Sequence, residues 1–261
     1  MNFSSRIILS ILIILLGINN LSFSFLMRNN HTDLLTITES QEAQDNSHEI
    51  YENYNRVSSL KNLKVGDVVE FGRFYDIVDD EILKVPIKWQ VLDELNGFAL
   101  LITDYIIKTM PYNYSWSPTN WKESNIRTWL NNDFYDIAFN DTEKHQIQKV
   151  ITENTGNFSY NINDQFQTND HVFLLSIEEA RKYYNTSEAY MALGTEYAIR
   201  EGLWISRYAT SVGFSVWWLR SPGRTWSSAA IVHAAGGIGL GGDGVATRGN
   251  GVRPCIWVKI D

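Results

Sequence analysis

The chain has 261 residues, of which 44% are hydrophobic and 13% aromatic, so it can bury the core of one domain of ordinary size. Its 30 acidic residues outnumber its 22 basic residues, giving a net charge of −8. Nucleic acid and anionic lipid are both bound by clustered Lys and Arg side chains, so this balance argues against nucleic acid and against charge-driven membrane binding. The single cysteine, Cys255, excludes an intramolecular disulfide and a thiolate zinc site, and we expect it to pack as a small hydrophobic side chain.

Residues 1–24 have the pattern of a secretory signal peptide. Arg6 precedes an apolar run from Ile7 to Ile18 that is too short to cross a bilayer comfortably. Ser22 and Ser24 offer the small side chains that a signal peptidase reads, which predicts cleavage after Ser24. The alternative is an uncleaved anchor that continues through Leu26. We therefore expect an extracytoplasmic protein, secreted or anchored at the cell surface, that meets a membrane only through an uncleaved N-terminal segment.

The next segment, residues 25–63, is polar and acid-leaning from Met27 onward and is predicted to be a stalk, because it has little apolar surface to offset the entropy of ordering. A globular domain is predicted over residues 64–261. It opens with three runs rich in β-forming residues, at 68–74, 87–92 and 98–102. Asn96 and Gly97 separate the last two runs and are a strong hairpin signal.

Three short helices are predicted in the middle of the chain. Each begins with a side chain that can cap a helix and has a Glu three residues later, at Asn120 and Glu123, Asn140 and Glu143, and Ser176 and Glu179. We expect these helices to end near Ala138, Val150 and Tyr184, with a buried strand at 172–175 between the second and the third.

The last third of the domain is rich in glycine, tryptophan and β-forming residues. Strands are predicted at 216–219, 229–232 and 252–260, with tight turns available at 236–237, 243–244 and 250–251. The order of strands, then helices, then strands predicts an α+β domain with a mixed, mostly antiparallel sheet and a few short helices in the middle of the chain.

The sequence contains no convincing motif for catalysis or cofactor binding. Gly237, Gly239 and Gly242 match G-x-G-x-x-G, but the glycine-rich sequence after them cannot form the helix that a dinucleotide site needs. Turns and close backbone packing explain these glycines better. The five histidines are not at ligand spacing from one another, and no Ser-His-Asp set can be identified. We predict no catalytic residue, no metal site and no cofactor.

Aromatic residues are abundant, with nine Trp and thirteen Tyr. Four lie at apolar-periodic positions and are predicted to be core, namely Trp89, Trp129, Trp217 and Trp257. Another set lies in loop-like sequence rich in Asn, Ser, Thr and Pro, namely Tyr112, Tyr114, Trp116, Trp121 and Trp226. Exposed aromatic rings beside amide side chains suit the recognition of a glycan or a protein. The alternative is that these rings pin irregular loops.

Several segments occur in an order that points to a family. They run from Pro86 to Leu92, Trp121 to Asn131, Val172 to Ser176, Trp218 to Gly223 and Gly251 to Pro254. Together they resemble DUF6273, a bacterial domain family of unknown function that has no assigned activity. The closing pattern is in turn similar to the C-type lectin-like fold of formylglycine-generating enzymes and of the variable receptors of diversity-generating retroelements. The chain lacks the cysteine pair of that oxidase and the calcium motifs of sugar-binding lectins, so the resemblance implies a fold rather than either activity.

The leading interpretation is an exported, non-catalytic recognition module for a glycan or protein ligand. An extracellular enzyme acting on glycan or peptide through unidentified residues is the alternative, and a structural envelope domain is a third. The binding surface is predicted on the late loops, because glycine-rich turns leave backbone donors and acceptors free and because the lectin-like receptors bind through the corresponding stretch. The candidate residues are Arg224, Trp226, His233, Asp243, Arg248 and Asn250.

Two other arginines are predicted to be structural. Arg220 and Arg253 lie in apolar, strand-like sequence that must bury part of its surface. A buried guanidinium group needs carboxylate or carbonyl partners, so each should have one.

Overall fold

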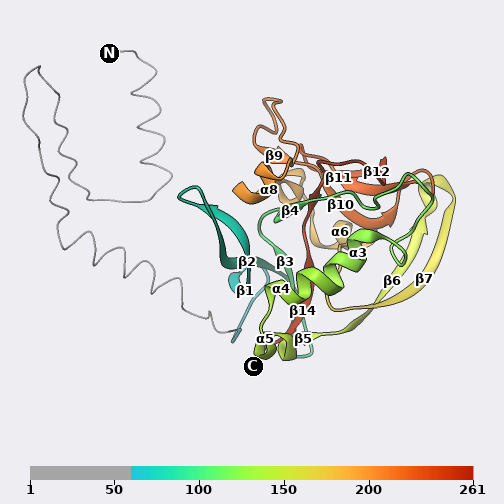
Figure 1. Cartoon of the computed structure of the whole chain (residues 1–261). Helices are drawn as coiled ribbons and strands as arrows, with labels where there is room; N and C mark the ends of the chain where they lie inside the picture. Colours follow the sequence, from blue (N-terminus) through green and yellow to red (C-terminus); the bar gives the residue numbers. More distant parts are fainter. Residues whose placement is uncertain (1–59, 261) are drawn as a thin grey trace, which may run out of the picture. The chain divides into compact units, whose positions relative to one another are not determined.

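The computed structural model describes residues 60–260 (Figure 1). The predicted signal or anchor segment and nearly all of the predicted stalk lie outside the described residues. Leu60 and Leu63 are buried, so the packing of the domain includes the last residues of the predicted stalk. No helix in the described part of the chain is long and apolar enough to cross a membrane.

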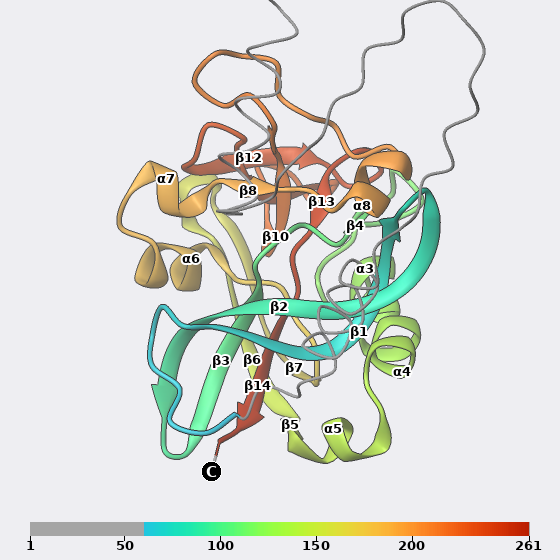
Figure 2. The ribbon, with the colours of Figure 1, turned by 90° about the vertical axis from the view of Figure 1, so that its left-hand side faces the viewer.

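The first sheet occupies the lower half of the domain in Figure 2. Its order is β1-β2-β3-β14-β5, with every neighbouring pair antiparallel. Its strands are β1 (Val68–Val78), β2 (Glu81–Leu95), β3 (Phe98–Thr103), β14 (Cys255–Lys259) and β5 (Ile147–Gln148). Asn96 and Gly97 both have positive φ and close the predicted hairpin between β2 and β3.

The second sheet lies in the upper half in the same view. Its order is β12-β11-β10-β13-β4, and only the β10–β13 pair is parallel. Its strands are β12 (Ile238–Gly244), β11 (Ser228–Val232), β10 (Trp217–Pro222), β13 (Gly251–Val252) and β4 (Lys108–Thr109). The predicted turn at 236–237 joins β11 to β12, whereas residues 243–244 lie inside β12 rather than in a turn.

Two further hairpins complete the strands of the described region. β6 (Val150–Asn157) and β7 (Ile162–Asp170) form a long antiparallel pair along one side of the domain, yellow in Figure 1. A short 3-10 turn, η2 (Phe158–Tyr160), forms its tip. β8 (Ala192–Leu193) and β9 (Phe214–Ser215) form the other pair. The β6–β7 pair was not predicted from the sequence. The predicted α+β class with mostly antiparallel sheets and few short helices is confirmed.

The helices are short and mostly lie in the middle of the chain. They are α3 (Asn125–Trp129), the π-helix η1 (Leu130–Phe134), α4 (Tyr135–Ala138), α5 (Asp141–Gln146), α6 (Ile177–Tyr183), α7 (Ser187–Tyr190) and α8 (Glu196–Arg200). The capping boxes predicted at the start of α5 and α6 are both present, so those two helix starts are confirmed.

Three boundary predictions are wrong, each for a local reason. Asn120 accepts a hydrogen bond from the Glu123 backbone but closes a turn, and Ser124 caps α3 instead. The second helix ends at Gln146, before Val150, because the chain continues into β5 and β6. Residues 172–175 are buried as predicted, but they make a single β-bridge, from Phe173 to Cys255, and not a strand.

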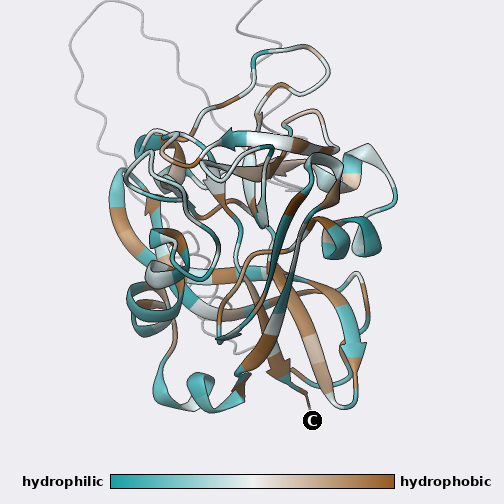
Figure 3. Cartoon of the chain, turned by 90° about the vertical axis from the view of Figure 1, so that its right-hand side faces the viewer, coloured by the Kyte–Doolittle hydropathy of each residue, from teal (hydrophilic) through white to brown (hydrophobic). Residues whose placement is uncertain are grey.

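The core lies between the sheets and the helices, and the strands of the first sheet are hydrophobic along much of their length (Figure 3). Trp89 and Trp217 are fully buried, as predicted. Trp129 and Trp257 are partly buried and pack against the core. Cys255 is buried, and burial raises the pKa of its thiol, so it packs as a hydrophobic side chain.

Two aromatic residues that the sequence placed in the exposed set are buried instead. The Trp121 indole donates to the Asp170 carboxylate at 2.9 Å, and the Tyr112 hydroxyl donates to the Arg220 carbonyl at 2.8 Å. Because buried Trp and Tyr keep their polar atoms hydrogen-bonded, these rings fix the loop between β4 and α3 to the core. The rest of the set is exposed, namely Tyr114, Trp116 and Trp226.

A buried carboxylate fixes α3 to the β6–β7 hairpin. Asp170 is fully buried, and its oxygens accept from the Arg127 guanidinium at 2.7 Å and from the hydroxyls of Thr152 and Thr168 at 2.8 and 2.7 Å, besides the Trp121 indole. A carboxylate that accepts this many hydrogen bonds can remain charged although it is buried from solvent.

Arg220 and Arg253 are buried and both have the partners that were predicted, while their contribution to stability stays a prediction. Arg220 forms a two-pronged ion pair with Glu179 and donates to the Leu174 carbonyl at 2.7 Å. Arg253 donates to the Thr103 carbonyl at 2.9 Å, and its guanidinium lies over the Trp217 ring at 5.1 Å from the centroid.

Candidate functional site

β12 is an edge strand of the second sheet and has glycine at several positions where side chains from other segments lie close to its backbone. Gly239 and Gly241 have ordinary φ angles, so their lack of a side chain is explained by contacts rather than by backbone conformation. A methyl group at Gly239 would lie 2.7 Å from the His233 imidazole. At Gly241 it would lie 3.2 Å from both the Arg224 guanidinium and the Tyr160 hydroxyl.

The same relation holds at the end of the strand. A methyl group at Gly244 would overlap the ring of Trp116, which therefore lies directly on the backbone of β12. Trp116 is nevertheless 65% exposed, so only one side of its indole is covered. We call this surface the β12 face, defined by Trp116, Tyr160, Arg224, Trp226 and His233 above the glycines of β12.

Backbone hydrogen bonds bring the loops of the β12 face together. Thr119 donates to the Trp226 carbonyl at 2.9 Å, and Arg224 donates to the Gly241 carbonyl at 3.0 Å. Asn113 donates to the Val245 carbonyl at 2.8 Å. Consequently the loop between β4 and α3, the β10–β11 connection and β12 form one continuous surface.

A buried amide holds the tip of the β6–β7 hairpin in the same place. The Asn157 side chain donates to the Pro222 carbonyl at 2.9 Å and to the Leu240 carbonyl at 2.8 Å. It therefore joins the end of β6 to both β10 and β12. The aromatic residues that follow it in the tip, Phe158 and Tyr160, are 64% and 43% exposed.

The six residues predicted for the binding surface lie in three different places. Arg224, Trp226 and His233 are exposed and belong to the β12 face. Asn250 is buried and therefore supports the fold rather than the exposed surface, and its amide donates to the partly buried Asp243 carboxylate at 2.9 Å. Arg248 is exposed on the following bend, and no hydrogen bond to a described residue connects its side chain to the other five.

A buried carboxyl lies beneath this surface, on β7. Asp164 is 8% exposed and accepts from the Asn120 amide at 3.4 Å. Burial raises the pKa of this carboxyl, while the hydrogen bond from Asn120 acts in the opposite direction. Asn120 is adjacent to Thr119, whose backbone is bonded to Trp226, so Asp164 lies close behind the β12 face.

Sequence reasoning missed part of the surface. Tyr160 carried no signal, because the hairpin that presents it was not predicted. Tyr114 and Trp116 were recognised as exposed aromatics, but their loop was treated as a separate place from the late loops. The signal that joins them is the glycine pattern of β12 itself, which marks where other side chains lie against the strand.

The family model described as Domain of unknown function (DUF6273) matches residues 96–260, more than half of the chain. The chain belongs to the DUF6273 family. No curated protein and no solved structure matches it. The DUF6273 match includes all of the β12 face, whereas β1 and β2 precede it.

Proposed function

We propose that this DUF6273 protein is an exported, non-catalytic recognition module that binds a glycan through the β12 face. The observation that carries the proposal is the Trp116 indole, which lies on Gly244 with its other side open to solvent. An aromatic ring held in place against a backbone offers a flat apolar surface at little entropic cost, which suits the apolar side of a sugar ring.

The polar groups beside the rings suit the rest of a sugar. The Arg224 guanidinium and the Tyr160 hydroxyl approach the same position above Gly241, and His233 lies over Gly239. These groups can donate hydrogen bonds to hydroxyl oxygens, and the Tyr160 and His233 side chains can also accept. A surface of rings with such groups between them matches the amphipathic nature of a glycan better than that of an apolar ligand.

The finer fold assignment belongs to the same proposal. We infer a C-type lectin-like arrangement from the segment between Trp218 and Gly223, the glycine-rich hairpin after it and the closing strand that contains Cys255. The support is the sequence pattern, together with a closing strand, β14, that pairs with β3 of the first sheet. An experimental structure that superposes on a lectin-like domain with the same strand order would test it.

Export is proposed on the pattern of residues 1–24. Fractionation of the source cells should place the protein outside the cytoplasm, and N-terminal sequencing should find either Phe25 or an uncleaved start. A wholly cytoplasmic protein would contradict this part of the proposal without affecting the binding surface.

The binding proposal is tested with arrays of glycans and peptides probed with the full chain. Replacing Trp116 or Trp226 by Ala should weaken the strongest glycan hit by about 2 kcal/mol, roughly 30-fold in Kd, if each ring is a central anchor. Stability should change little, because both rings are largely exposed. The matched control is Trp204→Ala, which removes an indole that is 46% exposed and lies outside the β12 face.

The outcomes separate the ligand classes. Glycan binding lost in Trp116→Ala and Trp226→Ala but kept in Trp204→Ala supports the proposal. Peptide hits that Trp116→Ala and Trp226→Ala both weaken, without any glycan hit, would transfer the surface to protein recognition. Glycan binding that both substitutions leave intact would remove the β12 face as the site.

A further inference from the structure

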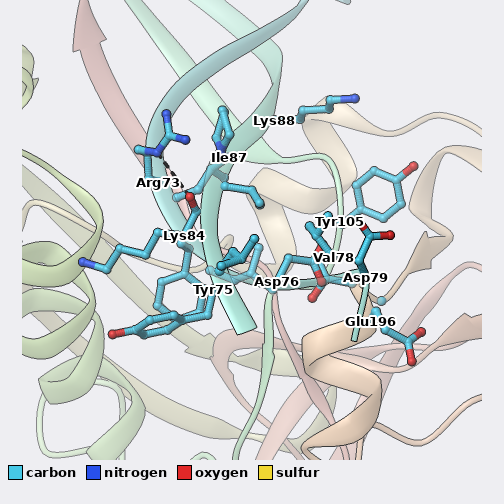
Figure 4. A pocket seen from close by; sticks show the side chains of 17 residues that line it. Arg73, Tyr75, Asp76, Val78, Asp79, Lys84, Ile87, Lys88, Tyr105 and Glu196 are labelled. Atoms are coloured by element: carbon cyan, nitrogen blue, oxygen red, sulfur yellow. Dashed lines mark hydrogen bonds between the residues drawn. The ribbon is translucent and has the colours of Figure 1, made fainter. Parts of the chain in front are cut away.

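A hollow lies on the β1–β2 hairpin and shares no residue with the β12 face. Its volume is about 580 Å³, within the range of about 300–1,000 Å³ typical of small-ligand sites. One wall is the hairpin, and the other is formed by Tyr105, Ile107 and residues 194–196 (Figure 4). Apart from the second wall, its residues precede the part of the chain that matches DUF6273.

The middle of the hollow is apolar. Phe74 is paired with Val85 in the register of the hairpin, and both line the hollow together with Ile87 and Ile107. Phe74, Ile87 and Ile107 are buried, whereas Leu83 is 38% exposed at the rim. Such a floor accepts an apolar side chain.

Charge is distributed unevenly along the same hairpin. The cations that line the hollow, Arg73, Lys84 and Lys88, lie toward its base, and the anions Asp76 and Asp79 lie toward its tip, with Glu196 on the opposite wall. Figure 4 shows Arg73 and Lys84 at the left, Asp79 and Glu196 at the lower right, and Lys88 apart from both groups at the upper right. A ligand that spans the apolar middle therefore meets positive charge at one end and negative charge at the other.

Most of these charges already have partners, and two do not. The Asp76 carboxylate accepts from the Tyr197 backbone at 3.0 Å, and the Lys84 ammonium donates to the Ile137 carbonyl at 3.1 Å. The side chains of Lys88 and Asp79, in contrast, make no hydrogen bond or ion pair with any described residue. The two charges left for a ligand thus stand at opposite ends.

We propose that this hollow binds a short extended peptide with free termini. Its carboxylate pairs with Lys88 at the base, its amino group lies at the tip beside Asp79 and Asp76, and an apolar side chain in its middle covers Phe74 and Ile107. In the hairpin register Val78, the neighbour of Asp79, is opposite Glu81, seven residues along β2 from Lys88. At about 3.3 Å per residue these backbone positions are about 23 Å apart, and a pentapeptide of about 17 Å meets both charges when the Lys88 and Asp79 side chains extend toward its ends.

The test uses titration calorimetry of the full chain with the pentapeptide Ala-Ala-Phe-Ala-Ala. The free peptide should bind, and N-acetylation or C-amidation should each weaken binding about tenfold, because a charged hydrogen bond is lost. The dipeptide Ala-Phe should bind at least tenfold more weakly than the pentapeptide, since it cannot reach both ends.

Single substitutions connect each terminus to its residue. Lys88→Gln should weaken binding of the free peptide about tenfold and leave binding of the C-amidated peptide unchanged. Asp79→Asn should weaken binding of the free peptide about tenfold and leave binding of the N-acetylated peptide unchanged. Asn is a suitable replacement because it tolerates the positive φ of 50° at this position. The matched control is Lys122→Gln, at an exposed lysine outside the hollow, which should change nothing.

Three results would overturn the proposal. They are the absence of peptide binding at millimolar concentration, equal binding of free and capped peptides, and an equal effect of Lys88→Gln on free and amidated peptides. The substitution Trp116→Ala should leave peptide binding intact. A failure of the glycan proposal would therefore not be mistaken for a failure of this one.

Discussion

The most informative single substitution is Arg220→Met, because Arg220 joins three parts of the fold. Its guanidinium pairs with both oxygens of Glu179 on α6 and donates to the Glu153 carbonyl on β6 at 2.9 Å, while its own backbone lies in β10. The side chain is 2% exposed and that of Glu179 is 31% exposed. Removing one partner of a buried ion pair costs about 3–5 kcal/mol, and for a domain of this size that corresponds to a Tm lower by roughly 6–20 °C.

Urea unfolding followed by tryptophan fluorescence measures this loss. Glu179→Gln should also destabilise, since it leaves the Arg220 charge without its counterion but keeps an oxygen for the capping box at Ser176. The control is Arg181→Met, at an exposed position of α6, where a change within about 0.5 kcal/mol is expected. If Arg220→Met left stability unchanged while ligand binding disappeared, Arg220 would have to be placed in the binding site.

Two further predictions concern the β12 face. Gly244→Ala should displace the Trp116 ring and weaken glycan binding as much as Trp116→Ala does. The double variant should bind no more weakly than either single variant. If the two losses of binding free energy were additive instead, the two positions would act separately. Asp164→Asn should raise the free energy of unfolding at neutral pH. The pKa of the Asp164 carboxyl is raised in the folded state, so the folded protein binds more protons than the unfolded chain. The stability of the unsubstituted protein therefore falls as pH rises above 3.8, the ordinary pKa of the carboxyl, and Asn removes this loss. Below that pH the two proteins should unfold alike in urea titrations, and a loss of stability at neutral pH in Asp164→Asn would show that the ionised form is the stabilising one.

Local signals in the sequence predicted the elements that depend on few residues. The Asn96-Gly97 hairpin and the capping boxes of α5 and α6 are of this kind, because a turn or a cap is decided by the side chains within about four positions. Burial of Arg220 and Arg253 also followed from their apolar, strand-like surroundings. Their partners could not be predicted, since Glu179 is 41 residues from Arg220 in the sequence.

The β6–β7 hairpin shows why the rest could not be predicted. Its inward-facing positions are polar, including Thr152, Asn154, Asp164 and Thr168, so it lacks the apolar alternation that indicates a strand. The polar side chains are tolerated because partners come from elsewhere, as the Trp121 indole and the Arg127 guanidinium do for Asp170. The same contact explains why Trp121 is buried although its surrounding sequence resembles an exposed loop.

The glycines of β12 bear on how a binding surface is inferred from sequence. Gly242 has a φ of +63°, and its place is explained by backbone conformation, whereas at Gly244 a methyl group would overlap the Trp116 ring and at Gly241 it would only press on the ends of the Arg224 and Tyr160 side chains. The two kinds of glycine cannot be distinguished in a sequence, where a glycine-rich stretch predicts turns and loops at both. A strand with glycine at these positions leaves room for side chains from other segments, and those of Trp116, Arg224 and Tyr160 come from three different loops. The candidate surface is therefore specified mainly by residues far from β12 in sequence, and a side chain added at Gly244 should disturb it more than one added at Gly237, where a methyl group would meet no atom within 4 Å.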